Sequence, residues 1–148
     1  MKKLSKHFAL IVVMATLRLS AVADQTWLGG TDNQWTNTAN WSGNALPGSG
    51  DWVIYNNLSA ANLSNWLGGD FTVGSIVVSN PPAPVSINSD VNTLTINAGT
   101  GVGINLASAT QPMAISANVA LGANQSWIVA TNQSLAVSGV LSGGGTLY

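Results

Sequence analysis

The chain has 148 residues and a formal net charge of −1 at pH 7, with five Asp, four Lys or Arg, one His and no Cys. Every Lys, Arg and His lies in the first 18 residues, so the 125 residues from Asp24 onward carry no basic side chain. Phosphate groups and anionic lipid surfaces are bound through Lys and Arg, so this composition excludes nucleic acid as a partner. Without cysteine, burial and backbone hydrogen bonds must hold the fold.

The N-terminus has the layout of a secretory signal peptide. Three lysines within the first six residues precede a mainly apolar run from Phe8 to Leu17, and Ala21-Val22-Ala23 then supplies small residues at both positions of an A-x-A cleavage site. A helix of ten residues spans about 15 Å, half of the roughly 30 Å hydrocarbon core, which favours a leader over an anchor. We predict that residues 1–23 are removed between Ala23 and Asp24. No later apolar run is long enough to span a membrane.

The composition after Asp24 predicts an all-β domain. Gly, Asn, Ser and Thr make up 57 of these 125 residues, and most of them favour turns and caps over long helices. Between them lie short bursts of alternating apolar residues, such as Val85/Ile87, Leu94/Ile96 and Leu135/Val137. Such period-two bursts, bounded by turn-forming residues, are typical of half-buried strands.

Two regions follow each other in chain order. Residues 24–69 are rich in Trp and are predicted to form an N-terminal cap, with the clearest strand at Trp52–Tyr55 and a turn at Asn56-Asn57. Residues 70–148 are richer in Val, Ile and Leu, and apolar bursts alternate with turns there. We predict that this second region forms the repeated part of the fold.

A loose internal repeat points to a solenoid. Segments beginning at Val91, Met113 and Leu135 each join alternating apolar residues to a turn containing Gly, at a spacing of roughly 20 residues. In a parallel β-helix, inward apolar side chains stack on those of the neighbouring coils. An antiparallel β-sandwich also uses short strands and frequent turns, and composition alone leaves both architectures open.

A Trp-rich array resembles the start of bacterial proteins built from autotransporter-associated β-strand repeats. The array comprises Trp27-Leu-Gly-Gly, Trp35, Asn40-Trp41-Ser, Pro47 and Asp51, and looser similarity continues through Leu94-Thr-Ile-Asn-Ala-Gly to Val140-Leu-Ser-Gly-Gly-Gly. This resemblance implies a right-handed parallel β-helix that is secreted or displayed at the bacterial cell surface, beyond the outer membrane. It also implies that the chain is the N-terminal part of a longer autotransporter-type passenger with a structural or adhesin-like role.

The side chains after Asp24 offer little chemistry, so we predict no catalytic residue and no cofactor. Glycoside hydrolysis needs two carboxyl groups about 5 to 9.5 Å apart, whereas the Asp residues lie far apart in sequence. Only stacking of Asp70 above Asp90 in neighbouring coils could pair two of them, as in a fragment of a β-helical polysaccharide-degrading enzyme. No Ser has a His or Lys to activate it, and no basic side chain could abstract a proton.

Calcium is the one metal that these residue types could bind, through carboxylate and carbonyl oxygens. Asp32-Asn33 and Asp90-Val91-Asn92 each offer two oxygen-bearing side chains, but no D-x-[DN]-x-[DN]-G pattern is present. Asp and Asn also cap turns, and we favour that role. We therefore predict no metal site.

The tryptophans are the best candidates for a binding function. Trp27, Trp35 and Trp41, if exposed on one side, would form a platform for sugar rings, and the partner would then be an extracellular polysaccharide or a host or cell surface. The alternative is that they form the core of the cap, which we favour because the region has few Leu or Ile. The sequence thus predicts a non-catalytic exported structural protein, with a carbohydrate-binding module as the alternative.

Overall fold

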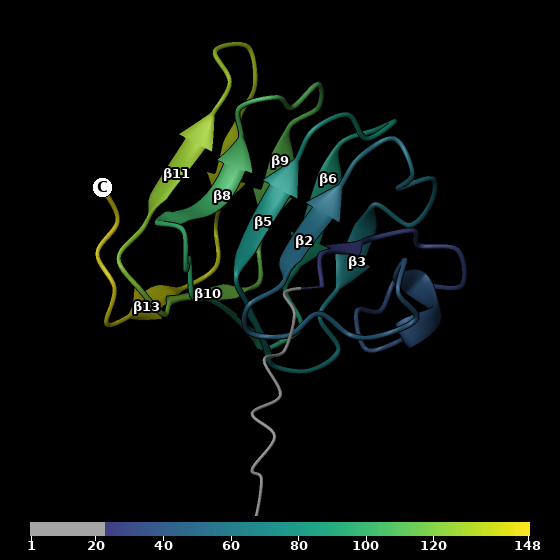
Figure 1. The fold of residues 1–148 in the computed structure, drawn as a ribbon, viewed down its shortest axis with the longest axis horizontal. Helices are drawn as coiled ribbons and strands as arrows, with labels where there is room; N and C mark the ends of the chain where they lie inside the picture. Colours follow the sequence, from purple (N-terminus) through teal and green to yellow (C-terminus); the bar gives the residue numbers. More distant parts are fainter. Residues whose placement is uncertain (1–22) are drawn as a thin grey trace, which may run out of the picture.

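The computed structural model describes residues 23–148, so the predicted signal peptide lies outside the described residues except for Ala23. This part of the chain is all-β, with one short 3-10 helix at Thr38–Asn40 (Figure 1). The first sheet consists of β1 (Gln25–Thr26), β2 (Trp52–Tyr55), β5 (Ser75–Val78), β8 (Val102–Leu106) and β11 (Ser126–Val129). The second sheet consists of β3 (Ser64–Trp66), β6 (Val85–Asn88), β9 (Met113–Ile115) and β12 (Leu135–Val137). The third consists of β4 (Phe71–Val73), β7 (Thr93–Ile96), β10 (Asn118–Leu121) and β13 (Leu141–Gly143).

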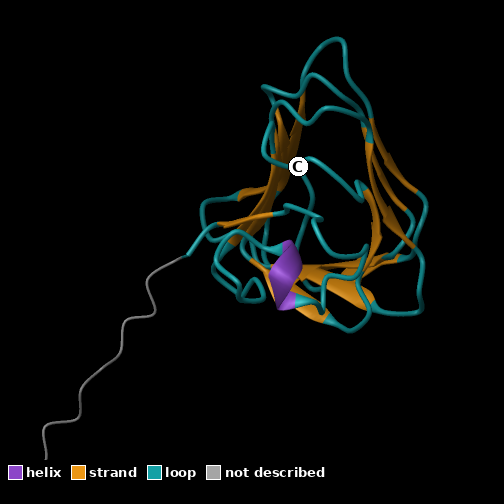
Figure 2. Ribbon diagram, turned by 90° about the vertical axis from the view of Figure 1, so that its right-hand side faces the viewer, coloured by secondary structure: helices purple, strands orange, loops and turns teal. Residues whose placement is uncertain are grey.

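The strands wind as a parallel β-solenoid of about four turns. From β2 onward, successive strands enter the first, second and third sheet in turn, so each turn of the chain adds one strand to every sheet. All the pairings between the strands named above are parallel, which excludes the antiparallel sandwich that composition left open. The antiparallel bridge between Trp27 and Trp41 lies in the cap. Viewed end-on, the three sheets form the walls of a roughly triangular tube (Figure 2).

The solenoid is right-handed, as the family resemblance implies. In Figure 1 the strands of the first sheet face the viewer and point upward, the second sheet lies behind them, and the turns advance from right to left. A chain that rises in front, descends behind and advances to the left follows a right-handed path. This is the hand that connections between parallel strands generally take.

The register gives turns of 22 to 28 residues, compared with the roughly 20 expected from the sequence. Val53 lies beside Ile76, which is 23 positions later, and Phe71 lies beside Leu94, again 23 positions later. One turn is longer, because Ile76 lies beside Ile104, 28 positions later. The extra residues lie in loops between strands, so the inward and outward faces of the strands stay in register.

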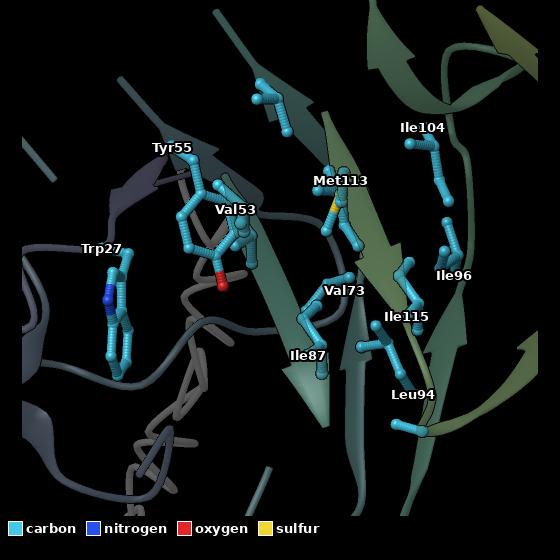
Figure 3. Close-up of a cluster of buried hydrophobic side chains, with 14 of the residues drawn as sticks. Trp27, Val53, Tyr55, Val73, Ile87, Leu94, Ile96, Ile104, Met113 and Ile115 are labelled. Carbon is cyan, nitrogen blue, oxygen red and sulfur yellow. The ribbon is translucent and has the colours of Figure 1, made fainter. Parts of the chain in front are cut away.

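The interior is filled by stacked apolar side chains. In the third sheet Phe71, Leu94 and Val119 occupy equivalent positions in three successive turns, and Leu94 and Val119 are completely buried. In the first sheet Val53 stacks beside Ile76 in the same way. Figure 3 shows such side chains from all three sheets pointing into one shared core. Because strand side chains alternate, the residues between them point outward, where the sequence supplies mainly polar or small side chains.

The ladders begin before the predicted boundary at residue 69. Strands β2 and β3 lie inside the Trp-rich segment, yet they pair in parallel with β5 and β6 of the next turn. The segment predicted as a cap therefore contains both the cap and most of the first turn. The part that lies across the end of the tube is the stretch from Trp27 to about Trp41 (Figure 1).

The two ends of the tube differ. At the first end the large side chains are buried, whereas in the last turn Trp127, Leu135 and Val137 are only partly buried. Leu141, which continues the stack of Leu94 and Val119, is 47% exposed. The last turn thus presents apolar side chains and unpaired strand edges to the surroundings.

The stacked core makes a direct prediction for Leu94. Replacing Leu94 with Ala should lower the free energy of unfolding by about 2–5 kcal/mol, because the shortened side chain leaves a cavity between the turns above and below. Leu58→Ala is the matched control, since Leu58 is 58% exposed and its loss should cost less than about 0.5 kcal/mol. Urea unfolding followed by circular dichroism measures both, and equal effects would contradict the described packing.

Candidate functional site

Trp27, Trp35 and Trp41 form one aromatic cluster with edge-to-face geometry. The ring centroids of Trp27 and Trp41 lie 5.0 Å apart at an interplanar angle of 79°, and those of Trp35 and Trp41 lie 5.2 Å apart at 89°. Trp35 also meets Phe71 of the first turn edge to face, with ring centroids 5.3 Å apart. Such pairs add about 0.5–1.5 kcal/mol each beyond the area that they bury.

Each indole N–H of the cluster has a hydrogen-bond acceptor. Trp41 Nε1 donates to the carbonyl of Trp35 at 2.8 Å, and Trp27 Nε1 donates to the carbonyl of Asn62 at 3.2 Å. Trp35 Nε1 donates to Oδ1 of Asn65 at 2.9 Å. The cluster therefore closes the first end of the tube without leaving a buried donor unpaired, which would cost about 1–3 kcal/mol.

The burial of these three side chains argues against the sugar platform. Trp27 and Trp35 are 0% exposed and Trp41 is 1% exposed, so none of them offers a ring face on which a sugar could stack. The core interpretation is the one that this burial supports. The physical reason is that the end of a solenoid must be covered, and Trp covers the most apolar area per residue.

Asn65 is the polar centre of this end of the tube. It points inward from β3, at the position that Ile87 occupies in the next turn, and it is fully buried. Its Oδ1 accepts from Trp35 Nε1 at 2.9 Å and from the hydroxyl of Tyr55 at 3.3 Å. Burial raises the pKa of Tyr55 above its usual range, so this hydroxyl stays protonated and acts as a donor. The arrangement is a structural contact between cap and first turn.

Asp32 organises the cap loop. Its Oδ2 accepts from Nδ2 of Asn37 at 2.8 Å, and its Oδ1 accepts from the backbone N–H of Gln34 at 2.9 Å and from Nδ2 of Asn40 at 2.7 Å. The hydrogen bond from the Asn37 side chain, followed by that from the Gln34 backbone, lowers the pKa of this carboxyl group. Asn40 is fully buried, and its Oδ1 accepts from the backbone of the same loop.

Asp70 and Asp90 tie neighbouring turns together instead of forming a pair. Asp70 Oδ1 accepts from the backbone N–H of Thr93 at 2.8 Å, and Asp90 Oδ2 accepts from that of Gly68 at 2.6 Å. Because one turn is 22 or 23 residues here, Asp90 lies level with Gly68 and Asp70 lies level with Thr93. The paired stacking that a 20-residue turn would produce is therefore offset by about two positions.

The two candidate calcium sites are occupied by hydrogen-bond donors. Asp32 faces the amides described above, and Asp90 Oδ1 accepts from the backbone N–H of Asn92 at 3.3 Å. Among residues 23–148 no group of three or more His, Cys, Asp or Glu is placed to hold a metal ion. These Asp and Asn side chains act as turn caps.

Hollows on the outer surface of residues 23–148 include two that border tryptophans outside the cap. One, of about 560 Å³, lies beside Trp52 and is lined also by Asp24, Asn97 and Thr100. The other, of about 470 Å³, lies beside Trp66 and is lined mainly by polar groups, Asp90 and Asn92 among them. Trp52 is 37% exposed, in contrast to the three cluster residues.

A signal for this exposure was present in the sequence. In Trp52-Val-Ile-Tyr55 the alternation places Val53 and Tyr55 on one face and Trp52 and Ile54 on the other. Once Val53 is assigned inward, Trp52 must point outward. The number of tryptophans in a region does not reveal this difference, because it carries no information about the face on which each side chain lies.

Comparison of the chain with protein-family models, curated proteins and solved structures finds no match. The resemblance to autotransporter-associated repeat proteins therefore stays a proposal. Among residues 23–148, no helix combines the length and the apolar character needed to cross a bilayer.

An apolar side chain at position 65 is predicted to destabilise the fold, although its column is otherwise aliphatic. Asn65→Leu would continue the aliphatic column of Ile87, yet it should lower the free energy of unfolding by about 1–3 kcal/mol, because Trp35 Nε1 and the Tyr55 hydroxyl would lose their acceptor. In a Tyr55→Phe background the same change should cost less, because one of the two orphaned donors is already absent. A double-mutant cycle by urea unfolding measures this coupling, and a stabilising Asn65→Leu would refute it.

The lowered pKa of Asp32 predicts a defined pH dependence. The ionised carboxylate stabilises the fold above the unfolded-state pKa of about 3.9, and this contribution is lost as pH falls through the lower folded-state pKa. Asp32→Asn should therefore lower stability at pH 7 and reduce the loss of stability that occurs as the pH falls below the unfolded-state pKa of about 3.9. Asp24→Asn, at an exposed carboxylate, is the control, and its stability at each pH should stay close to that of the wild type. Identical pH slopes in the wild type and Asp32→Asn would count against this role.

Proposed function

We propose that this chain is an exported, non-catalytic structural protein, the N-terminal part of an autotransporter-type passenger that presents an adhesin-like surface on a bacterial cell. The observation that carries the proposal is the solenoid itself, whose interior is filled by stacked apolar side chains and whose first end is closed by tryptophan. Such a body is a stiff spacer, because each turn is fixed by the turns on either side.

The use of the carboxylates supports a structural role. Asp32, Asp51, Asp70 and Asp90 each accept at least one backbone N–H, either in their own turn or from the neighbouring turn. General acid–base catalysis requires a carboxyl group aimed at a substrate, with a pKa raised toward the working pH. The hydrogen bonds that Asp32 accepts lower the pKa of its carboxyl group. These carboxylates stabilise turns by accepting hydrogen bonds from backbone N–H groups.

The exposed stack of the last turn supports a longer solenoid. Leu141 and Val129, the latter following Leu106 in its ladder, are 47% and 39% exposed, although their equivalents in earlier turns are buried. A further turn placed on β11, β12 and β13 would cover these side chains and pair the strand edges. This fits a passenger made of more turns than these four.

Export is tested by the N-terminus of the protein outside the cytoplasm. When the full sequence is expressed in a bacterium, the exported chain should begin at Asp24, as measured by intact mass. Ala23→Tyr should block the cut, since cleavage requires a small residue there. Ala60→Tyr, at an exposed Ala in a loop, should be cut normally. Retention of the uncut wild-type chain in the cytoplasm would contradict the proposal.

A further inference from the structure

The outer face of the first sheet carries a hollow centred on Trp52. A cavity of about 560 Å³ lies on one side of this side chain, lined by Asp24, Ser49, Asn97 and Thr100 among others. A smaller hollow of about 180 Å³ shares Trp52 and Thr100 and is lined further along the strands by Val77, Val102 and Asn105. We infer that this groove binds a neutral oligosaccharide, with one pyranose ring stacked on Trp52.

The exposure of Trp52 is imposed by the fold. Its neighbour Val53 is fully buried in the core, so the alternation of β2 turns the indole to the outside of the tube. In the parallel ladder Trp52 lies beside Ser75, whose small side chain is turned down to donate to the carbonyls of Val102 and Gly103. The indole therefore lies on a flat part of the sheet and remains 37% exposed.

The groove combines the two kinds of group that a sugar needs. The C–H face of a pyranose ring packs on an aromatic face, while its hydroxyls, which lie around the ring edge, need hydrogen-bond partners. Asn97 and Thr100 supply an amide and a hydroxyl, and Asp24 supplies a carboxylate that can accept from two hydroxyls. The Asn97 amide is only loosely engaged, since its Nδ2 lies 3.5 Å from the carbonyl of Ser49.

The local charge selects uncharged sugars. Asp24 lines the groove and Asp51 is adjacent to Trp52, whereas no Lys, Arg or His occurs from Asp24 to the last residue. Sulfated or uronic acid sugars would meet carboxylates without a balancing side chain. Cleavage before Asp24 would add one α-ammonium group beside the two carboxylates of Asp24 and Asp51, so a net negative charge would remain here.

The groove is held open by backbone. A Cβ added at Gly74 would lie 2.6 Å from the carbonyl oxygen of Gly50, so these two backbone segments pack closely under the site. A Cβ added at Gly99 would meet no heavy atom within 4 Å, so Gly99 borders open space. Two neighbouring hollows that share Trp52 and Thr100 suit a chain of sugars better than a single unit.

Two variants test the site without disturbing the core. Trp52→Ala removes the stacking face, and Gly99→Phe should fill the cavity, since Gly99 has open space and no left-handed φ. Two further variants are the matched controls. Trp66→Ala removes a partly exposed Trp on the second sheet, and Gly30→Phe places the same bulk at another glycine with open space. Thermal unfolding of all four confirms that they are folded before binding is measured.

The probes are hexamers of β-linked glucose, xylose and N-acetylglucosamine, with a galacturonic acid hexamer as the charged comparison. Calorimetry on purified protein should show at least one neutral hexamer binding with a Kd below about 1 mM, and Trp52→Ala and Gly99→Phe should each weaken it by at least about tenfold. The two control variants should bind like the wild type.

Three results would overturn the inference. They are binding to none of the neutral hexamers, tighter binding of the galacturonic acid hexamer, and loss of binding in Trp66→Ala with binding retained in Trp52→Ala. The last result would indicate that the sugar binds in the polar hollow beside Trp66 instead. The measurement uses purified protein, so its outcome is separate from that of the export test.

Discussion

Stacking of inward apolar side chains from one turn onto the next is the interaction on which this structure depends. A single turn, with three strands of three to five residues, has no core of its own, because its inner face is covered only by the turns on either side. Columns such as Phe71, Leu94 and Val119 therefore carry the stability of the whole tube. The outer polar contacts, such as that from Thr93 to Asp70, fix the level of each turn relative to its neighbour.

The same dependence explains the tryptophan cap. Within residues 23–148 no complete turn precedes the first one, so a preceding turn does not cover its inner side chains. Trp27, Trp35 and Trp41 instead cover the end with three large rings whose N–H groups bond to nearby carbonyl and amide oxygens. The first turn is adapted to the cap through Asn65, which occupies a position that is aliphatic in the next turn and supplies the acceptor for Trp35 Nε1. Cap and first turn are therefore matched to each other.

The period-two bursts predicted the strands well, because inward and outward faces require different chemistry at every turn. They did not decide between parallel and antiparallel pairing, since Val85-Ser-Ile has the same alternation in either. The echo at roughly 20 residues suggested turns, but the real register of 22 to 28 was hidden by loops of unequal length. That small difference decides whether Asp70 and Asp90 meet.

For the tryptophans, composition could not tell a covered end from an exposed platform, because both call for several aromatic residues within a short segment.

A fold that uses its entire interior for stability leaves function to its outer face. There the requirements of stacking do not apply, so a large apolar side chain on that face is not explained by the core. Trp52 is such a side chain, because the alternation of β2 turns it outward and its neighbour in the adjacent strand, Ser75, is small and buried. The tryptophans that seemed equivalent in sequence therefore separate by direction. Those of the cap hold the tube closed, and Trp52, on the outer face of β2, is available to a ligand.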